Sequence, residues 1–135
     1  MVVHDLAAAV DFFVALGLVL QGEDEVSGGW VDRIIGLDGV QSRIAYLETP
    51  DGHSHVELSE FRSPSSPEAD QRTPANAPGL RHLSFIVDDL DAVLANLRAR
   101  GVELVGEVQQ YEQVYRLCYI WGPEGIIVEL AEQLG

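Results

Sequence analysis

Two stretches of the chain have the spacing of an amphipathic helix. In both, apolar residues recur every three or four positions, at Leu6, Val10 and Phe13 and again at Leu90, Leu94 and Leu97. An aspartate stands directly before each stretch, at Asp5 and Asp89, where its side chain can accept a hydrogen bond from the first helical turn. A glycine follows each stretch, at Gly17 and Gly101. The pattern therefore predicts one capped helix near the start of each half of the chain.

The two helical stretches belong to a longer internal repeat. Residues 3–10, Val-His-Asp-Leu-Ala-Ala-Ala-Val, align with residues 87–94, Val-Asp-Asp-Leu-Asp-Ala-Val-Leu, at an offset of 84. Further on, a Pro-Asp-Gly turn at 50–52 parallels Pro-Glu-Gly at 123–125, and the offset has fallen to 73. A repeat of this length indicates two copies of one supersecondary module. The first copy is longer in its middle, and we place its extra residues at 27–39.

Strand-like segments fill the space between the helices and the turns. They are rich in Val, Ile, Leu and aromatic residues, and they cover residues 18–26, 40–48, 55–61, 81–87, 102–108, 116–121 and 126–131. A short helical turn is expected at 30–36. Four of the six prolines fall between Arg62 and Gly79, among serines, alanines and polar residues, which is typical of a linker.

These elements predict an α+β protein made of two tandem βαβββ modules that form a curved mixed sheet around a central cleft. The first module covers residues 1–61, with its first strand cut short at Met1. The linker covers residues 62–79, and the second module covers residues 80–135. Inward-facing side chains of both modules can converge in the cleft, so we expect a small ligand to bind there.

Charge and cysteine content narrow the choice of partners. The chain has 135 residues and a formal net charge of −14, from 22 acidic and 8 basic residues, which would repel both a nucleic acid and an anionic membrane surface. The single cysteine, Cys118, excludes an intramolecular disulfide, and no leader-like segment is visible, so we expect a cytoplasmic protein. Cys118 lies in a strand-like run without an obvious base and is interpreted as a buried apolar residue without chemistry.

Two glutamates occupy the same place in the two modules. Glu57 and Glu129 each stand in the sequence Val-Glu-Leu, late in the last predicted strand, and alternation places them on the face opposite their apolar neighbours. His82 begins the first strand of the second module. One imidazole and two carboxylates form a mixed nitrogen and oxygen set, which suits Zn, Ni, Co, Mn or Fe. Glu57, His82 and Glu129 are therefore candidate ligands of a divalent metal ion.

The same residues also have a simpler interpretation. In a chain with 22 acidic residues, a glutamate on a half-exposed strand usually belongs to the solvated face, and for either glutamate alone we favour that reading. The matching repeat positions, taken together with His82, favour the metal site for the three residues as a set. His4 is interpreted as a surface histidine and His55 as a partly exposed residue near a turn. Three aromatic residues of the predicted strands could wall a substrate cavity, although aromatics in strands are more often core residues: Tyr46, Tyr119 and Trp121. Trp30 in the extra segment could act as a lid.

Four short pieces, taken in order, resemble the modules of the glyoxalase/bleomycin resistance protein/dioxygenase (vicinal oxygen chelate) superfamily. They are His4-Asp5-Leu6 leading to Phe12-Phe13, Pro50-Asp51-Gly52-His53 leading to Val56-Glu57-Leu58, the run from Leu80 to Leu90, and Gly122-Pro123-Glu124-Gly125 leading to Val128-Glu129-Leu130. The resemblance extends over nearly the whole chain. In that family a metal ion is held by one residue of the first strand and one residue of the last strand of each module.

Carried over by position, Glu57, His82 and Glu129 fill three of the four ligand places. The fourth place belongs to the first strand of the first module, and subtracting 84 from the number of His82 gives a position ahead of Met1. Either the coding sequence begins further upstream, or the protein has lost this ligand. Water must then replace the missing donor, so we expect the 135-residue chain to carry little or no tightly bound metal.

The resemblance also implies a reaction class. It is that of a divalent-metal-dependent lyase or isomerase, acting on a small substrate with vicinal oxygens through an enolate or enediolate. By resemblance to lactoylglutathione lyase and methylmalonyl-CoA epimerase, Glu129 is the residue that moves the proton. The alternative is a metal-free protein of the bleomycin-resistance type, which binds a drug or metabolite between the modules. Many relatives cover their sheet edges by pairing chains, so a homodimer is expected.

Overall fold

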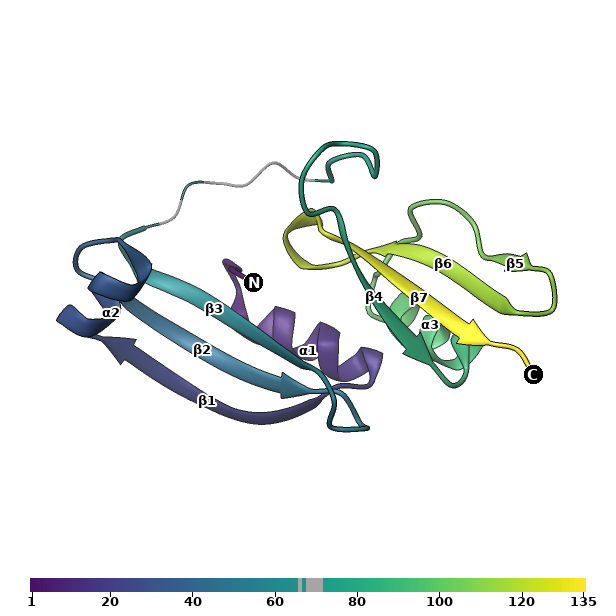
Figure 1. Cartoon of the computed structure of the whole chain (residues 1–135), viewed down its shortest axis with the longest axis horizontal. Helices are drawn as coiled ribbons and strands as arrows, with labels where there is room; N and C mark the ends of the chain where they lie inside the picture. Colours follow the sequence, from purple (N-terminus) through teal and green to yellow (C-terminus); the bar gives the residue numbers. More distant parts are fainter. Residues whose placement is uncertain (66, 68–71) are drawn as a thin grey trace. The chain divides into compact units, whose positions relative to one another are not determined.

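The computed structural model divides the chain into two compact units, Met1–Ala69 and Asp70–Gly135. It describes residues 1–65, 67 and 72–135. Each unit holds one sheet and one long helix that lies against one face of that sheet (Figure 1). The predicted α+β class is therefore confirmed. The boundary between the units falls inside the predicted linker, 62–79.

The first unit contains a three-stranded antiparallel sheet in the order β1-β2-β3. Its elements are α1 (Leu6–Leu16), β1 (Val19–Ser27), α2 (Gly29–Ile35), β2 (Gln41–Glu48) and β3 (His55–Ser63). Ahead of α1, Val2 forms an isolated parallel bridge with Ser59 of β3, and the amide of Val3 donates to the Ser59 carbonyl at 2.9 Å. The first strand of the βαβββ module is thus reduced to a single bridge.

The second unit contains a four-stranded mixed sheet in the order β4-β7-β6-β5. Its elements are β4 (His82–Val87), α3 (Leu90–Ala99), β5 (Gln109–Tyr111), β6 (Tyr115–Trp121), the 3-10 turn η1 (Pro123–Gly125) and β7 (Ile127–Gln133). The first and last strands of the unit, β4 and β7, are parallel, and the other pairs are antiparallel. This is the complete βαβββ order.

The predicted strand at 102–108 is wrong in most of its length. A bridge between Leu104 and Ile120 holds this segment against β6, with hydrogen bonds from the Val105 amide to the Tyr119 carbonyl at 2.8 Å and from the Trp121 amide to the Glu103 carbonyl at 2.9 Å. The backbone then bends at Val105 and Gly106, and pairing resumes in the three residues of β5. A glycine inside an apolar run weakens a strand because it offers no side chain to pack.

Strand pairing confirms the internal repeat independently of residue identity. Val2 lies opposite Ser59 in the first unit, and Ile86 lies opposite Ala131 in the second. The pairing therefore equates position 2 with position 86, which is the offset of 84 found in the sequence. The core follows the same symmetry, since the predicted apolar helix positions Leu6 and Phe13, and Leu90 and Leu97, are all fully buried.

A glutamate of the last strand closes the start of the helix in each unit. The carboxylate of Glu60 in β3 accepts a hydrogen bond from the Leu6 amide at 2.7 Å, and that of Glu132 in β7 accepts one from the Leu90 amide at 2.8 Å. The first amides of a helix lack partners within the helix, and its amino end carries a partial positive charge. An anionic acceptor at this point therefore stabilises the helix and ties it to the strand.

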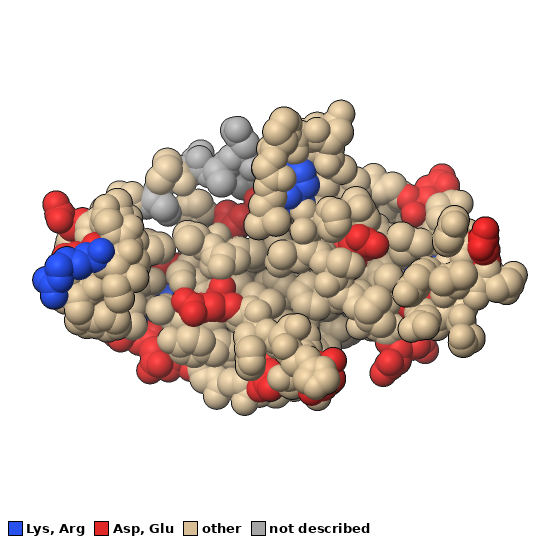
Figure 2. Space-filling model, viewed as in Figure 1, with Lys and Arg blue, Asp and Glu red and all other residues tan. Residues whose placement is uncertain are grey.

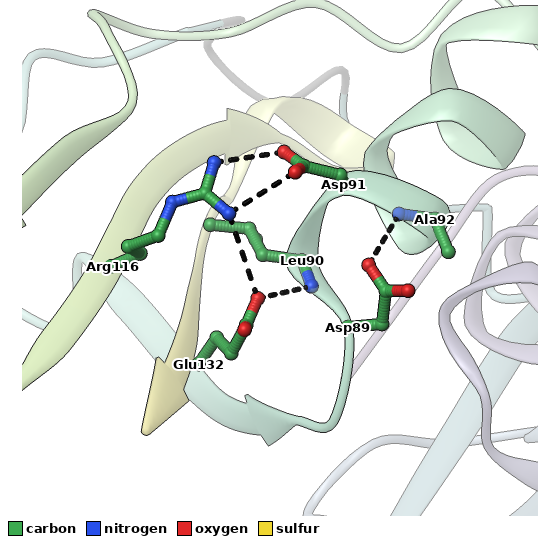
Figure 3. A network of polar contacts seen from close by, with 6 residues as sticks. All are labelled: Asp89, Leu90, Asp91, Ala92, Arg116 and Glu132. Carbon is green, nitrogen blue, oxygen red and sulfur yellow. Dashed lines mark hydrogen bonds and ion pairs between the residues drawn. The ribbon is translucent and has the colours of Figure 1, made fainter. Parts of the chain in front are cut away.

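Two further contacts complete this arrangement in the second unit (Figure 3). Asp89 caps α3 by accepting from the Ala92 amide at 2.9 Å, as the sequence predicted. Arg116 of β6 donates to both carboxylate oxygens of Asp91, at 2.8 and 3.1 Å, and lies 3.8 Å from Glu132. The bonded Arg116 guanidinium lowers the pKa of Asp91, and Asp91 in turn raises the pKa of Arg116.

Acidic side chains recur over the face of the molecule in Figure 2, whereas arginines occur at only a few points. This agrees with the net charge of −14.

Within the described part of the chain, none of the helices has both the length and the apolar character that crossing a bilayer requires.

Removal of the glutamate that binds the first helix amide should measurably lower stability. Glu132→Ala should lower the free energy of unfolding of the second unit by about 1–2 kcal/mol, because a charged hydrogen bond to a helix amide is lost. Urea unfolding can be followed by the fluorescence of Trp121 in a Trp30→Phe background. Glu107→Ala is the matched control, because this exposed glutamate contacts only Gln109, and it should change the value by less than about 0.5 kcal/mol. Equal effects of the two substitutions would contradict the capping role.

Candidate functional site

The sheet of the second unit leaves one face free of its helix. Along β4 the side chains of His82, Ser84 and Ile86 are exposed, while the alternate residues are less so. Strand register places Tyr119, Glu129 and Ser84 in one row across β6, β7 and β4. The strands β4 and β7 are parallel, and His82 pairs with Ile127, two residues before Glu129. His82 and Glu129 therefore lie in neighbouring rows on the same face of the sheet.

Two of the predicted site residues come together on this face. The Nε2 atom of His82 lies 3.2 Å from an Oε2 atom of Glu129. The Glu129 side chain is 20% exposed and that of His82 is 40% exposed, so both groups remain accessible to a small molecule. The ring of Tyr119 lies against the imidazole of His82, with 5.1 Å between ring centroids. The tyrosine therefore limits the rotation of the histidine, a role that the core interpretation of Tyr119 did not anticipate.

Glu57 belongs to the first unit and has the surroundings expected from the repeat. It is exposed in β3 and pairs across the sheet with Tyr46, as Glu129 pairs with Tyr119. Its backbone carbonyl accepts a hydrogen bond from the amino group of Met1 at 2.8 Å. The convergence of Glu57 with His82 and Glu129 stays a prediction.

The first-unit counterpart of His82 can be located from strand pairing. Val2 takes the place of Ile86, so Met1 takes the place of Phe85. His82 stands three residues before Phe85, and its counterpart is therefore the third residue before Met1. That position lies ahead of Met1.

The spacing of the two donors suits a shared metal ion. With metal–ligand bonds of about 2.1 Å, two donors are about 3.0 Å apart at octahedral angles and about 3.4 Å apart at tetrahedral angles. The separation of 3.2 Å between His82 and Glu129 falls between these values. Within the described ranges, however, no three or more His, Cys, Asp or Glu side chains are grouped closely enough to hold an ion. The second unit thus supplies a preformed pair of donors.

Arg72, in the predicted linker 62–79, also contacts a strand of the second unit. The guanidinium of Arg72 lies 5.4 Å from the ring centroid of Trp121, which is in the same row of the sheet as His82. A bond of 3.1 Å to Glu103 holds Arg72 in place and lowers the pKa of that carboxyl group. The proline-rich surroundings of Arg72 gave no indication of this contact, because Arg72 and Trp121 are far apart in the sequence.

The remaining residues considered as candidates have different surroundings. His53 is exposed and lies 3.7 Å from Asp51 in the turn before β3, and His55 is exposed at the start of that strand. Trp30 is 57% exposed on α2. Cys118 is buried, and burial raises the pKa of its thiol to about 11, which agrees with its interpretation as a residue without chemistry.

Comparison with known proteins identifies relatives over the whole fold. A glyoxalase family protein from Bacillus cereus is 47% identical in sequence, with a TM-score of 0.95, and the match covers 100% of this chain and 91% of that one. The uncharacterized protein YaeR of Escherichia coli K12 is 40% identical over 83 residues, which is 61% of this chain and 60% of YaeR. The match therefore spans less than two thirds of that curated relative.

More distant structures share the fold. The trypanothione-dependent glyoxalase I of Leishmania major is 18% identical, with a TM-score of 0.64, over 98% of this chain and 81% of that one. The model of the Glyoxalase/Bleomycin resistance protein/Dioxygenase superfamily matches residues 1–130. This match takes in both βαβββ units and the strands that carry Glu57, His82 and Glu129. The chain therefore belongs to the glyoxalase/bleomycin resistance protein/dioxygenase superfamily.

Proposed function

We propose that this protein is a divalent-metal-dependent lyase or isomerase of the glyoxalase type, acting on a small substrate with neighbouring oxygen atoms. The observation that carries the proposal is the pair formed by His82 and Glu129, whose donor atoms are 3.2 Å apart on the free face of a sheet. Glu57, at the equivalent strand position of the first unit, would supply a third donor. Nitrogen and carboxylate donors of this kind suit Zn, Ni, Co, Mn or Fe.

When bound, the ion would supply a Lewis acid that stabilises negative charge on the substrate oxygens. Glu129 has two carboxylate oxygens, so it can bind the ion through one and accept a proton through the other. On an α-hydroxycarbonyl substrate, Glu129 would remove the proton from the carbon that bears the hydroxyl group and return it to the neighbouring carbon, while the hydroxyl proton passes to the former carbonyl oxygen. The proton count is unchanged, as an isomerisation requires.

Tyr119 would act as a positioning residue for this step. Its ring lies against the imidazole of His82, and a His82 held in one orientation would keep the ion beside Glu129. Holding the ion and the base side by side lowers the entropy that must be lost in the transition state. The partial burial of Glu129 among strand residues also limits the water that competes for its free oxygen.

Two other activities occur in this superfamily. A ring-cleaving dioxygenase needs a set of two histidines and one carboxylate, and a glutamate at position 57 argues against it. A metal-free binding protein, which sequesters a drug or metabolite, needs no ligand set at all. Retention of His82 beside Glu129 supports the enzyme. Ligand binding without turnover in any divalent metal would favour the sequestering protein instead.

Replacing the proposed base tests the reaction. Glu129→Gln should lower kcat on an α-hydroxycarbonyl substrate by about 10²–10⁴-fold, because an amide cannot accept the proton. The far-ultraviolet circular dichroism spectrum should stay unchanged, since glutamine has nearly the same shape. Glu107→Gln removes an exposed carboxylate elsewhere in the second unit and should keep full turnover. If Glu129→Gln also keeps full turnover, Glu129 is not the base.

Metal binding gives a second test. We expect the 135-residue chain to purify with little bound metal and to take up Zn²⁺ or Ni²⁺ in titration calorimetry. His82→Ala should weaken that uptake at least about tenfold, and so should Glu57→Ala if Glu57 joins the site. An extension of three residues that begins with histidine should raise metal occupancy, because its histidine takes the counterpart position of His82. Equal and stoichiometric metal with and without the extension would show that this position is unnecessary.

We further propose that the protein is a cytoplasmic homodimer. The strand β1 and the short strand β5 are edge strands of their sheets, and edges of this kind are commonly covered by a second chain. Multi-angle light scattering at micromolar concentration should therefore give about twice the mass of the 14.8 kDa chain. A monomer mass under these conditions would contradict the proposal.

A further inference from the structure

The first unit contains a polar cavity that the proposed reaction does not use. It has a volume of about 120 Å³ and is lined by residues of β1, β2 and β3, namely Glu25, Val26, Ser27, Gln41, Ser42, Arg43 and Arg62. All seven residues belong to the first unit. Two of the eight basic residues of a strongly acidic chain therefore border one small cavity.

Strand register explains why these arginines meet. Glu25, Arg43 and Glu60 form one row across β1, β2 and β3, on the face that α1 covers, because Glu60 binds the first amide of α1. Arg62 follows two residues after Glu60, at the β-bulge where Ser42 pairs with Phe61 and Gln41 with Ser63. Arg62 lies 3.4 Å from Glu25 of that row, so Arg62 and Arg43 share one face and both line the cavity. This is the face opposite Glu57.

The nearby carboxylates do not neutralise both arginines. Glu60 is engaged by the Leu6 amide at 2.7 Å. Glu25 lies 3.4 Å from Arg62, but the two side chains are 71% and 53% exposed, and an ion pair of that kind contributes little. Arg43 is half-buried and forms no ion pair with any carboxylate of the described residues. A half-buried guanidinium gains from an anionic partner.

The second unit shows what closes the equivalent place. In strand register, Arg116 stands opposite Glu132 just as Arg43 stands opposite Glu60. Arg116 also donates hydrogen bonds to both carboxylate oxygens of Asp91 on the helix. The counterpart of Asp91 in the first unit is Ala7, at the repeat offset of 84, and it has no charge to offer. The counterpart of Arg62 is Leu134, at the strand offset of 72. The first unit therefore lacks the helix carboxylate that binds the strand arginine in the second unit, and it carries a second arginine beside the cavity.

We propose that this cavity binds a small oxyanion, a carboxylate or phosphate group held by the guanidinium groups of Arg43 and Arg62. Both groups offer planar, paired donors that match the oxygens of such an anion. Ser27 and Gln41 line the same cavity, and the Ser27 hydroxyl and the Gln41 amide are able to donate further hydrogen bonds.

Size and charge define the ligand further. Drug-sized ligands occupy pockets of about 300–1,000 Å³, so a cavity of about 120 Å³ admits an anionic head group or a very small metabolite. The net charge of −14 opposes any anion, and Glu25 competes with it for Arg62. Binding is therefore weak, on the order of millimolar, and removal of the Glu25 charge strengthens it.

Titration of the ¹⁵N-labelled full chain with sodium phosphate, and separately with sodium acetate, tests this site at constant ionic strength. The amide signals of Ser27, Gln41 and Ser42 should shift and reach saturation with at least one of the two anions, and the anion that saturates them identifies the preferred head group. Arg43→Gln and Arg62→Gln should each weaken binding by about tenfold, because each removes one charged donor group. Glu25→Gln should tighten it by about threefold or more.

Arg100→Gln is the matched control for these variants. Arg100 is exposed at the end of α3 in the second unit, so the substitution makes the same change in net charge in the unit that does not contain the cavity. Its affinity for the anion should equal that of the unchanged chain. The proposal is overturned if the shifts never saturate with either anion, or if Arg43→Gln and Arg100→Gln weaken binding equally. Neither outcome depends on Glu129 or on bound metal, so the reaction is tested separately.

Discussion

In each module, a glutamate of the last strand accepts a hydrogen bond from the first amide of the helix. This bond fixes the start of the helix against the last strand, at the point where the first strand ends. In the second unit, β4 ends at Val87, which is paired with Glu132 of β7, and α3 begins three residues later at Leu90. The Glu132 carboxylate therefore lies where the chain turns from strand to helix, within reach of the Leu90 amide. Without it, a buried helix start would lack a partner for its amide and its positive end would lack a counter-charge.

The same strand also positions the candidate site. Glu129 stands three residues before Glu132 and therefore faces the other side of the sheet, away from the helix. The apolar neighbours Val128 and Leu130 are fully buried against the helix side, so the strand can neither slide nor rotate without exposing them. The parallel pairing with β4 then brings His82 to within 3.2 Å of Glu129. The chemistry proposed for this pair depends on that fixed register.

The two modules share this framework and differ in what they place on it. The second unit has a full first strand with His82, and it neutralises Arg116 with Asp91. The first unit keeps only the bridge at Val2, carries Ala7 in place of Asp91, and adds Arg62 beside Arg43. The two modules can differ in this way because both keep the hydrogen bond between helix and last strand, and both keep a buried apolar core. The exposed positions are then free to acquire different ligands.

The sequence by itself determined the two modules, the capped helices and nearly all of the strands, because apolar periodicity, Asp caps and glycine turns are local properties that repeat at a fixed offset. It also predicted Glu57, His82 and Glu129 as site candidates from their matching positions. It failed at residues 102–108, where an apolar run bends at Gly106 instead of continuing as a strand. Local composition does not reveal whether a partner strand is in reach.

Only the tertiary structure decided which side chains meet. The distance between His82 and Glu129, the ring of Tyr119 against His82, and Arg72 over Trp121 all join residues far apart in the sequence. The pairing of Arg116 with Asp91, and the cavity beside Arg43 and Arg62, likewise depend on strand register and on a bulge. These contacts arise from the order in which strands pair, and the order is set by burial of the whole core and not by any single segment.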